Sequence, residues 1–180
     1  MRKIGGRPLS QHLYLIALGS NQSHALAGRP RSILEQAIEA LEMEDIDVFA
    51  QSRIIDSLPL GPSHRKYANA AAIIATALEP DELLKRLLMI EQHFGRDRLG
   101  QRWRARPLDL DIILWSGGIW ESAIPPLAIP HISFRERAFV LGPAVEIAGH
   151  WRDPINNQTL HQLFHRLNRP KPLDRRQAAH

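Results

Sequence analysis

Segments with the patterns of buried strands and amphipathic helices alternate along the first 115 residues, and their order constrains the fold more than any other feature. Apolar runs that end at turn residues, such as Gly19-Ser20-Asn21, predict strands. Two stretches with apolar residues at helical spacing begin at Pro30 and Pro80. Proline has no backbone N–H, which costs little at the first position of a helix. The expected strands are residues 13–18, 48–55, 68–78 and 108–115, and the expected helices are residues 30–41 and 80–95.

The resulting order, βαββαβ, favours an α+β fold of the ferredoxin-like kind, with helices packed on one face of an antiparallel sheet. C-terminal helical additions are expected at residues 135–149 and 157–167, and Pro125, Pro126 and Pro130 are expected to stiffen the connection before them. This topology alone does not determine a function.

A chain of 180 residues with 44% hydrophobic content predicts one domain over residues 1–180. Its core should cover about residues 13–167, and the basic tail at residues 168–180 should be flexible. The longest apolar stretch, Ala70 to Leu78, falls far short of the roughly 20 residues of a membrane-spanning helix. With an amino terminus unlike a signal peptide, these features predict a cytoplasmic protein without a membrane partner, which we expect to be a monomer. The absence of cysteine excludes disulfides and thiolate metal sites.

Positive charge is concentrated in one short segment. The formal net charge is +4, and five arginines fall within residues 96–106. Clustered cations attract anions, so the segment indicates a nucleotide or a nucleic acid as the partner.

Two carboxylates follow the arginine-rich segment on the fourth expected strand. Asp109 and Asp111 are two residues apart, a spacing that returns to the same face of a sheet. Oxygen ligands in this arrangement suit magnesium, which could bridge the phosphates of a nucleotide while arginines hold the other oxygens. An isolated Asp-x-Asp pattern is more often a solvent-facing pair, but aspartate is disfavoured inside strands, and the neighbouring arginines favour a functional site.

The residues from Glu91 through Gly95-Arg96-Asp97-Arg98 to Arg106-Pro107-Leu108-Asp109-Leu110-Asp111 resemble the signature region of the hydroxymethyldihydropterin pyrophosphokinases. Four further blocks resemble this family in the same order. They are Ala17-Leu18-Gly19-Ser20-Asn21, Pro59-Leu60-Gly61-Pro62, Tyr67-Ala68-Asn69-Ala70-Ala71, and Ile129-Pro130-His131 with Arg137 and Phe139. The resemblance covers about residues 13 to 150 and implies the transfer of pyrophosphate from ATP to the hydroxymethyl group of a reduced pterin, leaving AMP, in folate biosynthesis.

The resemblance also implies roles for individual residues. Asp109 and Asp111 would bind two Mg2+ ions and, with Arg96 and Arg106, form the catalytic group. The residues on the ATP side would be Glu91, Arg96, Arg98, Trp103, Arg106, His131 and Arg137. The residues on the pterin side would be Ser57, Leu58, Leu60, Tyr67, Asn69 and Phe139. Arg98 and Trp103 would belong to a loop that closes over the site and excludes water.

Two other functions fit parts of the pattern. A βαββαβ RNA-binding module would suit the topology and the basic charge, but none of the expected strands carries the basic and aromatic motif of such modules. We therefore expect no nucleic-acid partner. A different phosphotransferase could use the same Asp-x-Asp chemistry, whereas a kinase of the P-loop type is excluded because its glycine-rich phosphate loop is missing.

Overall fold

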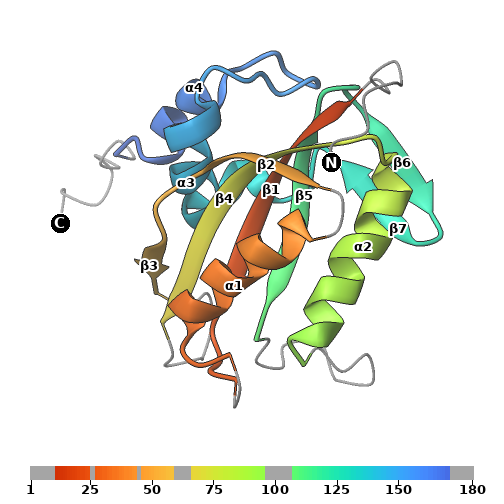
Figure 1. Cartoon of the computed structure of the whole chain (residues 1–180). Helices are drawn as coiled ribbons and strands as arrows, with labels where there is room; N and C mark the ends of the chain where they lie inside the picture. Colours follow the sequence, from red (N-terminus) through yellow and green to blue (C-terminus); the bar gives the residue numbers. More distant parts are fainter. Residues whose placement is uncertain (1–10, 25–26, 44–45, 59–65, 96–106, 171–180) are drawn as a thin grey trace, which may run out of the picture.

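The structure is a computed structural model, and it describes residues 11–24, 27–43, 46–58, 66–95 and 107–170 (Figure 1). The strands are β1 (His12–Ser20), β2 (Asp47–Gln51), β3 (Ile55–Ser57), β4 (Tyr67–Thr76), β5 (Asp109–Trp115), β6 (Trp120–Ala123) and β7 (Pro126–Ile129). The helices are α1 (Pro30–Glu42), α2 (Pro80–His93), α3 (Ala138–Ala148) and α4 (Leu160–Leu167), with a 3-10 turn, η1, at Phe134–Glu136.

The main sheet has the predicted topology. Its strands lie in the order β2-β4-β1-β5, with β3 also paired to β4, and every pairing is antiparallel. Since β1, α1, β2, β4, α2 and β5 follow one another along the chain, the ferredoxin-like βαββαβ arrangement is confirmed.

The prediction of one continuous strand over residues 48–55 is wrong, because the chain leaves the ladder between β2 and β3. The interruption lies at Ser52, which is buried and whose N–H donates to the carbonyl of Ala71 at 2.9 Å. The Ser52 hydroxyl oxygen accepts the N–H of Ala71 at 2.9 Å. In a regular strand pair, a backbone carbonyl oxygen would accept this N–H instead. Pairing resumes where Ile55 meets Asn69.

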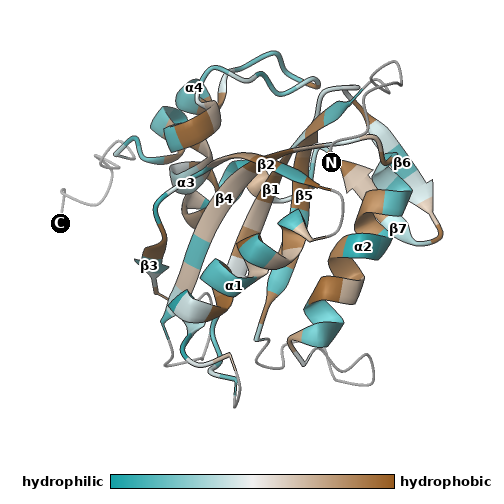
Figure 2. Ribbon diagram, in the orientation of Figure 1, coloured by the Kyte–Doolittle hydropathy of each residue, from teal (hydrophilic) through white to brown (hydrophobic). Residues whose placement is uncertain are grey.

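Helices cover both faces of the sheet (Figure 1). The first core lies under α1 and α2 and includes Ile16, Leu18, Leu110 and Ile112 from the central strands. The second core lies under α3 and α4, the helices added after the βαββαβ unit, and includes Leu15, Ala17, Ala71, Ile113 and Leu141. Figure 2 shows the resulting distribution of hydropathy, in which the central strands are mainly hydrophobic and the outward surface of α1 is mainly hydrophilic.

The β6–β7 hairpin was not predicted. The two strands pair from Trp120 opposite Ile129 to Ala123 opposite Pro126. Pro126 begins β7, a position where a proline is tolerated because its missing N–H interrupts no ladder. The Trp120 indole N–H donates to Asp81 at 3.1 Å, so the hairpin is fastened to the first turn of α2.

The C-terminal helices begin after well-defined local contacts. Thr159 and Gln162 form a reciprocal capping box at the start of α4. The connection between α3 and α4 is held by an ion pair of the buried Asp153, to both of whose oxygens Arg135 of η1 donates, at 2.6 and 2.7 Å. Within the described ranges, no helix has the length and apolar character needed to cross a bilayer.

Candidate functional site

Polar side chains meet at one end of the sheet, where three neighbouring strands are in register. Gly19 of β1 lies opposite Asn69 of β4 on one side and opposite Asp109 of β5 on the other. One step further along the same face, Ala17 lies between Ala71 and Asp111. The small residues of β1 therefore leave space between the amide of β4 and the carboxylates of β5.

Strand alternation directs the two carboxylates away from the α1–α2 core. Leu110 is buried under these helices, so Asp109 and Asp111 project to the opposite face, which α3 and α4 partly cover. The side chain of Asp111 is 34% exposed. Asp111 is thus placed at the border between the second core and solvent, where it can meet both protein and ligand.

His131 is held beside Asp111 by its own backbone and ring. Its N–H donates to the carbonyl of Ile113 at 3.1 Å, and its Nδ1 accepts the N–H of Ser133 at 3.2 Å. A neutral imidazole whose Nδ1 accepts carries its hydrogen on Nε2, and Nε2 lies 3.9 Å from Asp111 Oδ2. Burial lowers the pKa of His131 below its ordinary value of 6.5, with Arg137 acting in the same direction and Asp111 and Asp109 against it.

This shift predicts how His131 responds to pH. In the metal-free protein, we expect its ring protons to titrate in NMR spectra with a midpoint below 6.5. The folded protein then binds this proton more weakly than the unfolded chain does, so the stability that His131 contributes is present above about pH 6.5 and lost as the pH falls below it. A midpoint at or above 6.5 would contradict the placement of the ring.

The predicted pterin-side residues of β3 and β4 lie together. Asn69 is buried, and its Nδ2 donates to the Ser57 hydroxyl at 2.8 Å. Ser57 is paired with Tyr67, which lies two residues from Asn69 and therefore on the same face. Leu58, directly after β3, is 78% exposed. The hydrogen bond fixes the orientation of the Asn69 amide, so that its oxygen faces Gly19, whose added Cβ would lie 3.8 Å away.

Arg137 and Phe139 come from the start of α3. Arg137 is the N-cap residue of this helix, and Phe139 lies in its first turn, partly buried against the second core. One turn later, Gly142 approaches β3, because a Cβ added there would lie 3.9 Å from Ile55. The helix that carries Phe139 is therefore packed beside the strand that carries Ser57.

Glu91 approaches the site from the other face of the sheet. It lies in the last turn of α2, is 1% exposed, and accepts the N–H of Leu110 at 2.8 Å. This hydrogen bond joins Glu91 to the backbone between the two aspartates. The remaining predicted residues, Leu60, Arg96, Arg98, Trp103 and Arg106, lie outside the described residues.

The carboxylate oxygens of Asp109 and Asp111 suit a cation that also binds ligands from outside the protein. Asp109 and Asp111 offer hard oxygens on one face, whereas nowhere in the described ranges do three histidine, cysteine or acidic side chains gather into a metal cage. Magnesium is commonly bound by one or two carboxylates together with water and substrate phosphates. The residues present therefore fit Mg2+ bound jointly with a nucleotide.

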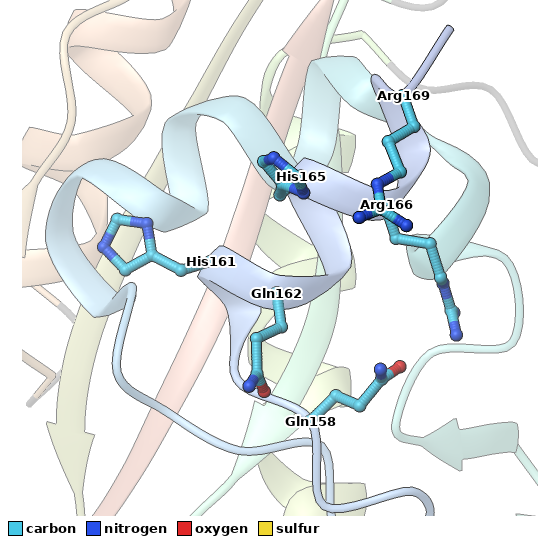
Figure 3. Close-up of a pocket in the computed structure, with 6 residues that line it drawn as sticks. All are labelled: Gln158, His161, Gln162, His165, Arg166 and Arg169. Atoms are coloured by element: carbon cyan, nitrogen blue, oxygen red, sulfur yellow. The ribbon is translucent and has the colours of Figure 1, made fainter. Parts of the chain in front are cut away.

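A separate groove lies on α4, at the opposite end of the sheet from the start of β5 (Figure 1). Its volume is about 430 Å3, and it is lined by Gln158, His161, Gln162, His165, Arg166 and Arg169 (Figure 3). The rings of His161 and His165 point in different directions, and Nε2 of His161 lies over Gly149. All the lining residues except Gln158 are exposed, as basic side chains on a solvent-facing helix usually are.

Comparison with known proteins identifies close sequence relatives. A family model for 7,8-dihydro-6-hydroxymethylpterin-pyrophosphokinase (HPPK) matches residues 15–149. The 2-amino-4-hydroxy-6-hydroxymethyldihydropteridine pyrophosphokinase of Synechocystis sp. is 37% identical over 162 residues, which cover 89% of this chain and 79% of the relative. The enzyme of the same name from Haemophilus influenzae is 39% identical over 150 residues, covering 82% of this chain and 88% of the relative.

Solved structures share the fold at lower sequence identity. The wild-type HPPK-DHPS of Plasmodium falciparum superposes with a TM-score of 0.69 at 12% identity. The match covers 87% of this chain but 41% of that longer one. At this identity, the likeness is one of fold.

Proposed function

The chain belongs to the 7,8-dihydro-6-hydroxymethylpterin-pyrophosphokinase family, and from this we propose that it transfers pyrophosphate from ATP to 6-hydroxymethyl-7,8-dihydropterin in folate biosynthesis. The pterin hydroxyl oxygen attacks the β-phosphorus of ATP, the bond from that phosphorus to the α–β bridging oxygen breaks, and AMP leaves while the hydroxyl proton is released. The observation that carries the proposal is the family match over residues 15–149, and the register of Asn69, Gly19 and Asp109 across three strands supports it.

We assign the binding of two Mg2+ ions to Asp109 and Asp111. When bound, the metal neutralises charge on the phosphates as the β-phosphorus is attacked. The two carboxylates lie on one face of β5, and the Leu110 side chain between them is anchored in the opposite core. This anchoring supports the assignment because it keeps the two acids directed to the same side.

On the pterin side, the Asn69 amide would read the hydrogen-bonding edge of the ring. Its Nδ2 already donates to Ser57, so, within the part of the chain that the structure describes, its second N–H and its oxygen remain for a ligand that offers both an acceptor and a donor. Tyr67 and Phe139 would stack on the flat ring, and Leu58 would add contacts at the strand end. Leu60 is assigned to the pterin by resemblance alone. The packing of α3 beside β3 supports this grouping.

On the ATP side, His131 and Arg137 would bind the nucleotide. A neutral His131 beside Asp111 can donate from Nε2 to a phosphate or sugar oxygen without adding charge. Arg137 can pair with phosphate oxygens bidentately. Arg96, Arg98, Trp103 and Arg106 are assigned by resemblance alone, to the triphosphate and to a closing loop.

We further propose that the enzyme is a cytoplasmic monomer without nucleic-acid or membrane partners. The RNA-binding alternative gains no support, since the family match covers residues 15–149 and concerns a pterin pyrophosphokinase.

The substrate requirement tests the function. The protein is incubated with Mg2+ and ATP, alone, with hydroxymethyldihydropterin, or with the 6-methyl analogue that lacks the hydroxyl, and nucleotides are separated by chromatography. We expect AMP only with the hydroxymethyl compound. AMP formation without pterin, or equal formation with the methyl analogue, would refute the proposed acceptor.

Gly19 provides a steric test of the space between Asn69 and Asp109. Among the described residues, a Cβ at Gly19 meets only the Asn69 amide oxygen, at an ordinary contact distance of 3.8 Å, so Gly19→Val should fold. Its methyl groups would extend into the space assigned to the pterin, and we expect the KM for pterin to rise about tenfold. Gly19→Ala serves as the milder control. A folded Gly19→Val enzyme with an unchanged KM for pterin would place the substrate elsewhere.

A further inference from the structure

We propose that Glu91 is a positioning residue, which holds the backbone of β5 at Leu110 so that Asp109 and Asp111 keep their common direction. The inference rests on the proposed function, because it concerns the same pair of carboxylates. It differs from the role implied by family resemblance, in which Glu91 would lie on the nucleotide side.

The burial of Glu91 is the first observation. The residue is 1% exposed and lies in the last turn of α2, whose Leu87 and Ile90 belong to the first core. A carboxylate is costly to bury unless hydrogen bonds satisfy its oxygens. Moreover, α2, which carries Glu91, packs on the face of the sheet opposite to the one on which the aspartates project.

The hydrogen bond to Leu110 is the second observation. In register, Leu110 lies opposite Leu18 of β1, but its N–H donates at 2.8 Å to Oε1 of Glu91. Among the described residues, β5 is the last strand of the sheet on this side. An N–H on that edge has no strand partner there, and Glu91 supplies the acceptor that a further strand would otherwise provide.

The position of this bond in the strand gives it a consequence for the site. Leu110 is the residue between Asp109 and Asp111, so fixing its peptide group fixes the backbone on which both carboxylates are mounted. Catalytic groups must be held to within a fraction of an ångström, and a displacement of about 1 Å can cost about 100-fold in rate. Glu91 would thereby affect the reaction rate indirectly, by keeping the side chains of Asp109 and Asp111 in the orientation that the reaction requires.

Two substitutions separate this role from direct contact with a substrate or metal. Glu91→Gln keeps an oxygen that can accept the Leu110 N–H but removes the carboxylate, whereas Glu91→Leu removes the acceptor. The matched controls are Glu39→Gln and Glu39→Leu, at an exposed position of α1. Circular dichroism and thermal melting establish which variants are folded.

The first readout requires no reaction. Amide hydrogen exchange, followed by NMR, reports the protection of the Leu110 N–H directly. We expect exchange close to wild type in Glu91→Gln and at least about tenfold faster in Glu91→Leu, with the other β5 amides that bond to β1 changed much less. The second readout is the affinity for Mn2+ with α,β-methylene-ATP, which should weaken about tenfold only in Glu91→Leu.

Turnover completes the test. We expect kcat for AMP formation to fall about 100-fold in folded Glu91→Leu and to stay within about threefold of wild type in Glu91→Gln. If Glu91→Gln loses as much activity as Glu91→Leu, the carboxylate acts directly and the proposal fails. It fails equally if Glu91→Leu keeps normal metal affinity and turnover. Absence of AMP formation in the wild type would instead refute the proposed function, while the exchange of Leu110 would still test the strand contact.

Discussion

Replacing Asp111 with asparagine is expected to lower kcat for AMP formation by about 1,000-fold while leaving the fold intact. Asparagine has the same size as aspartate, but it lacks the negative charge that holds a hard cation. With the cation bound more weakly, the negative charge of the ATP phosphates is less well neutralised. The Asp111 side chain is partly exposed to solvent, so the substitution removes no side chain from the hydrophobic core.

The matched control for this substitution is Asp47→Asn. Asp47 is an exposed carboxylate on β2, at the opposite edge of the sheet from β5, and we expect its variant to keep full activity. Initial rates of AMP release at saturating substrates, together with thermal melts, give the comparison. Near-normal turnover in folded Asp111→Asn would eliminate the carboxylate pair as the metal site.

The second large effect is expected on stability. Asp153 is fully buried and accepts two hydrogen bonds from Arg135 and one from the N–H of Ile155. Asp153→Ala leaves the Arg135 guanidinium without its partner, so we expect the free energy of unfolding to fall by about 3 kcal/mol, measured by urea denaturation. Since Arg135 belongs to η1, which lies between His131 and Arg137, the loss should also raise the KM for ATP.

The pH dependence of stability provides an independent check on Asp153. Burial raises the pKa of this carboxyl, but the hydrogen bonds from Arg135 and Ile155 outweigh it and hold the pKa below the ordinary value of 3.8. Its contribution is therefore present above about pH 3.8 and lost as the pH falls through the lower, folded value. The control is Asp56→Ala, which breaks an exposed pair with Arg31 and should cost about 0.5 kcal/mol or less. Equal losses in the two variants would contradict the account of the buried pair.

The order of strands and helices could be predicted because it depends on patterns of apolar residues that are close together in the sequence. Apolar runs and helical spacing, punctuated by Pro30, Pro80 and turn residues, determine the βαββαβ sequence of elements. The position of Asp109 and Asp111 on one strand face also follows from local alternation. These features depend on residues close together in the chain, so a single sequence contains enough information to identify them.

Features that depend on distant residues were missed. The break between β2 and β3 follows from the bond of Ser52 to Ala71, and nothing in residues 48–55 alone indicates it. The same holds for the contact of Glu91 with Leu110, 19 residues away, because it requires α2 to be packed against the edge of the sheet. The prolines that begin and flank β7 predict only a stiffened connection, although a short hairpin strand tolerates them.

The most direct test of the central claim is a phosphorus-31 NMR time course of the wild-type protein with Mg2+, ATP and hydroxymethyldihydropterin. Pyrophosphoryl transfer predicts that the three ATP resonances are replaced by one AMP singlet and the paired doublets of a pterin diphosphate, in equal amounts. Appearance of ADP with a pterin monophosphate would mean that the γ-phosphorus is attacked. That result would contradict the assignment of this site to pyrophosphate transfer.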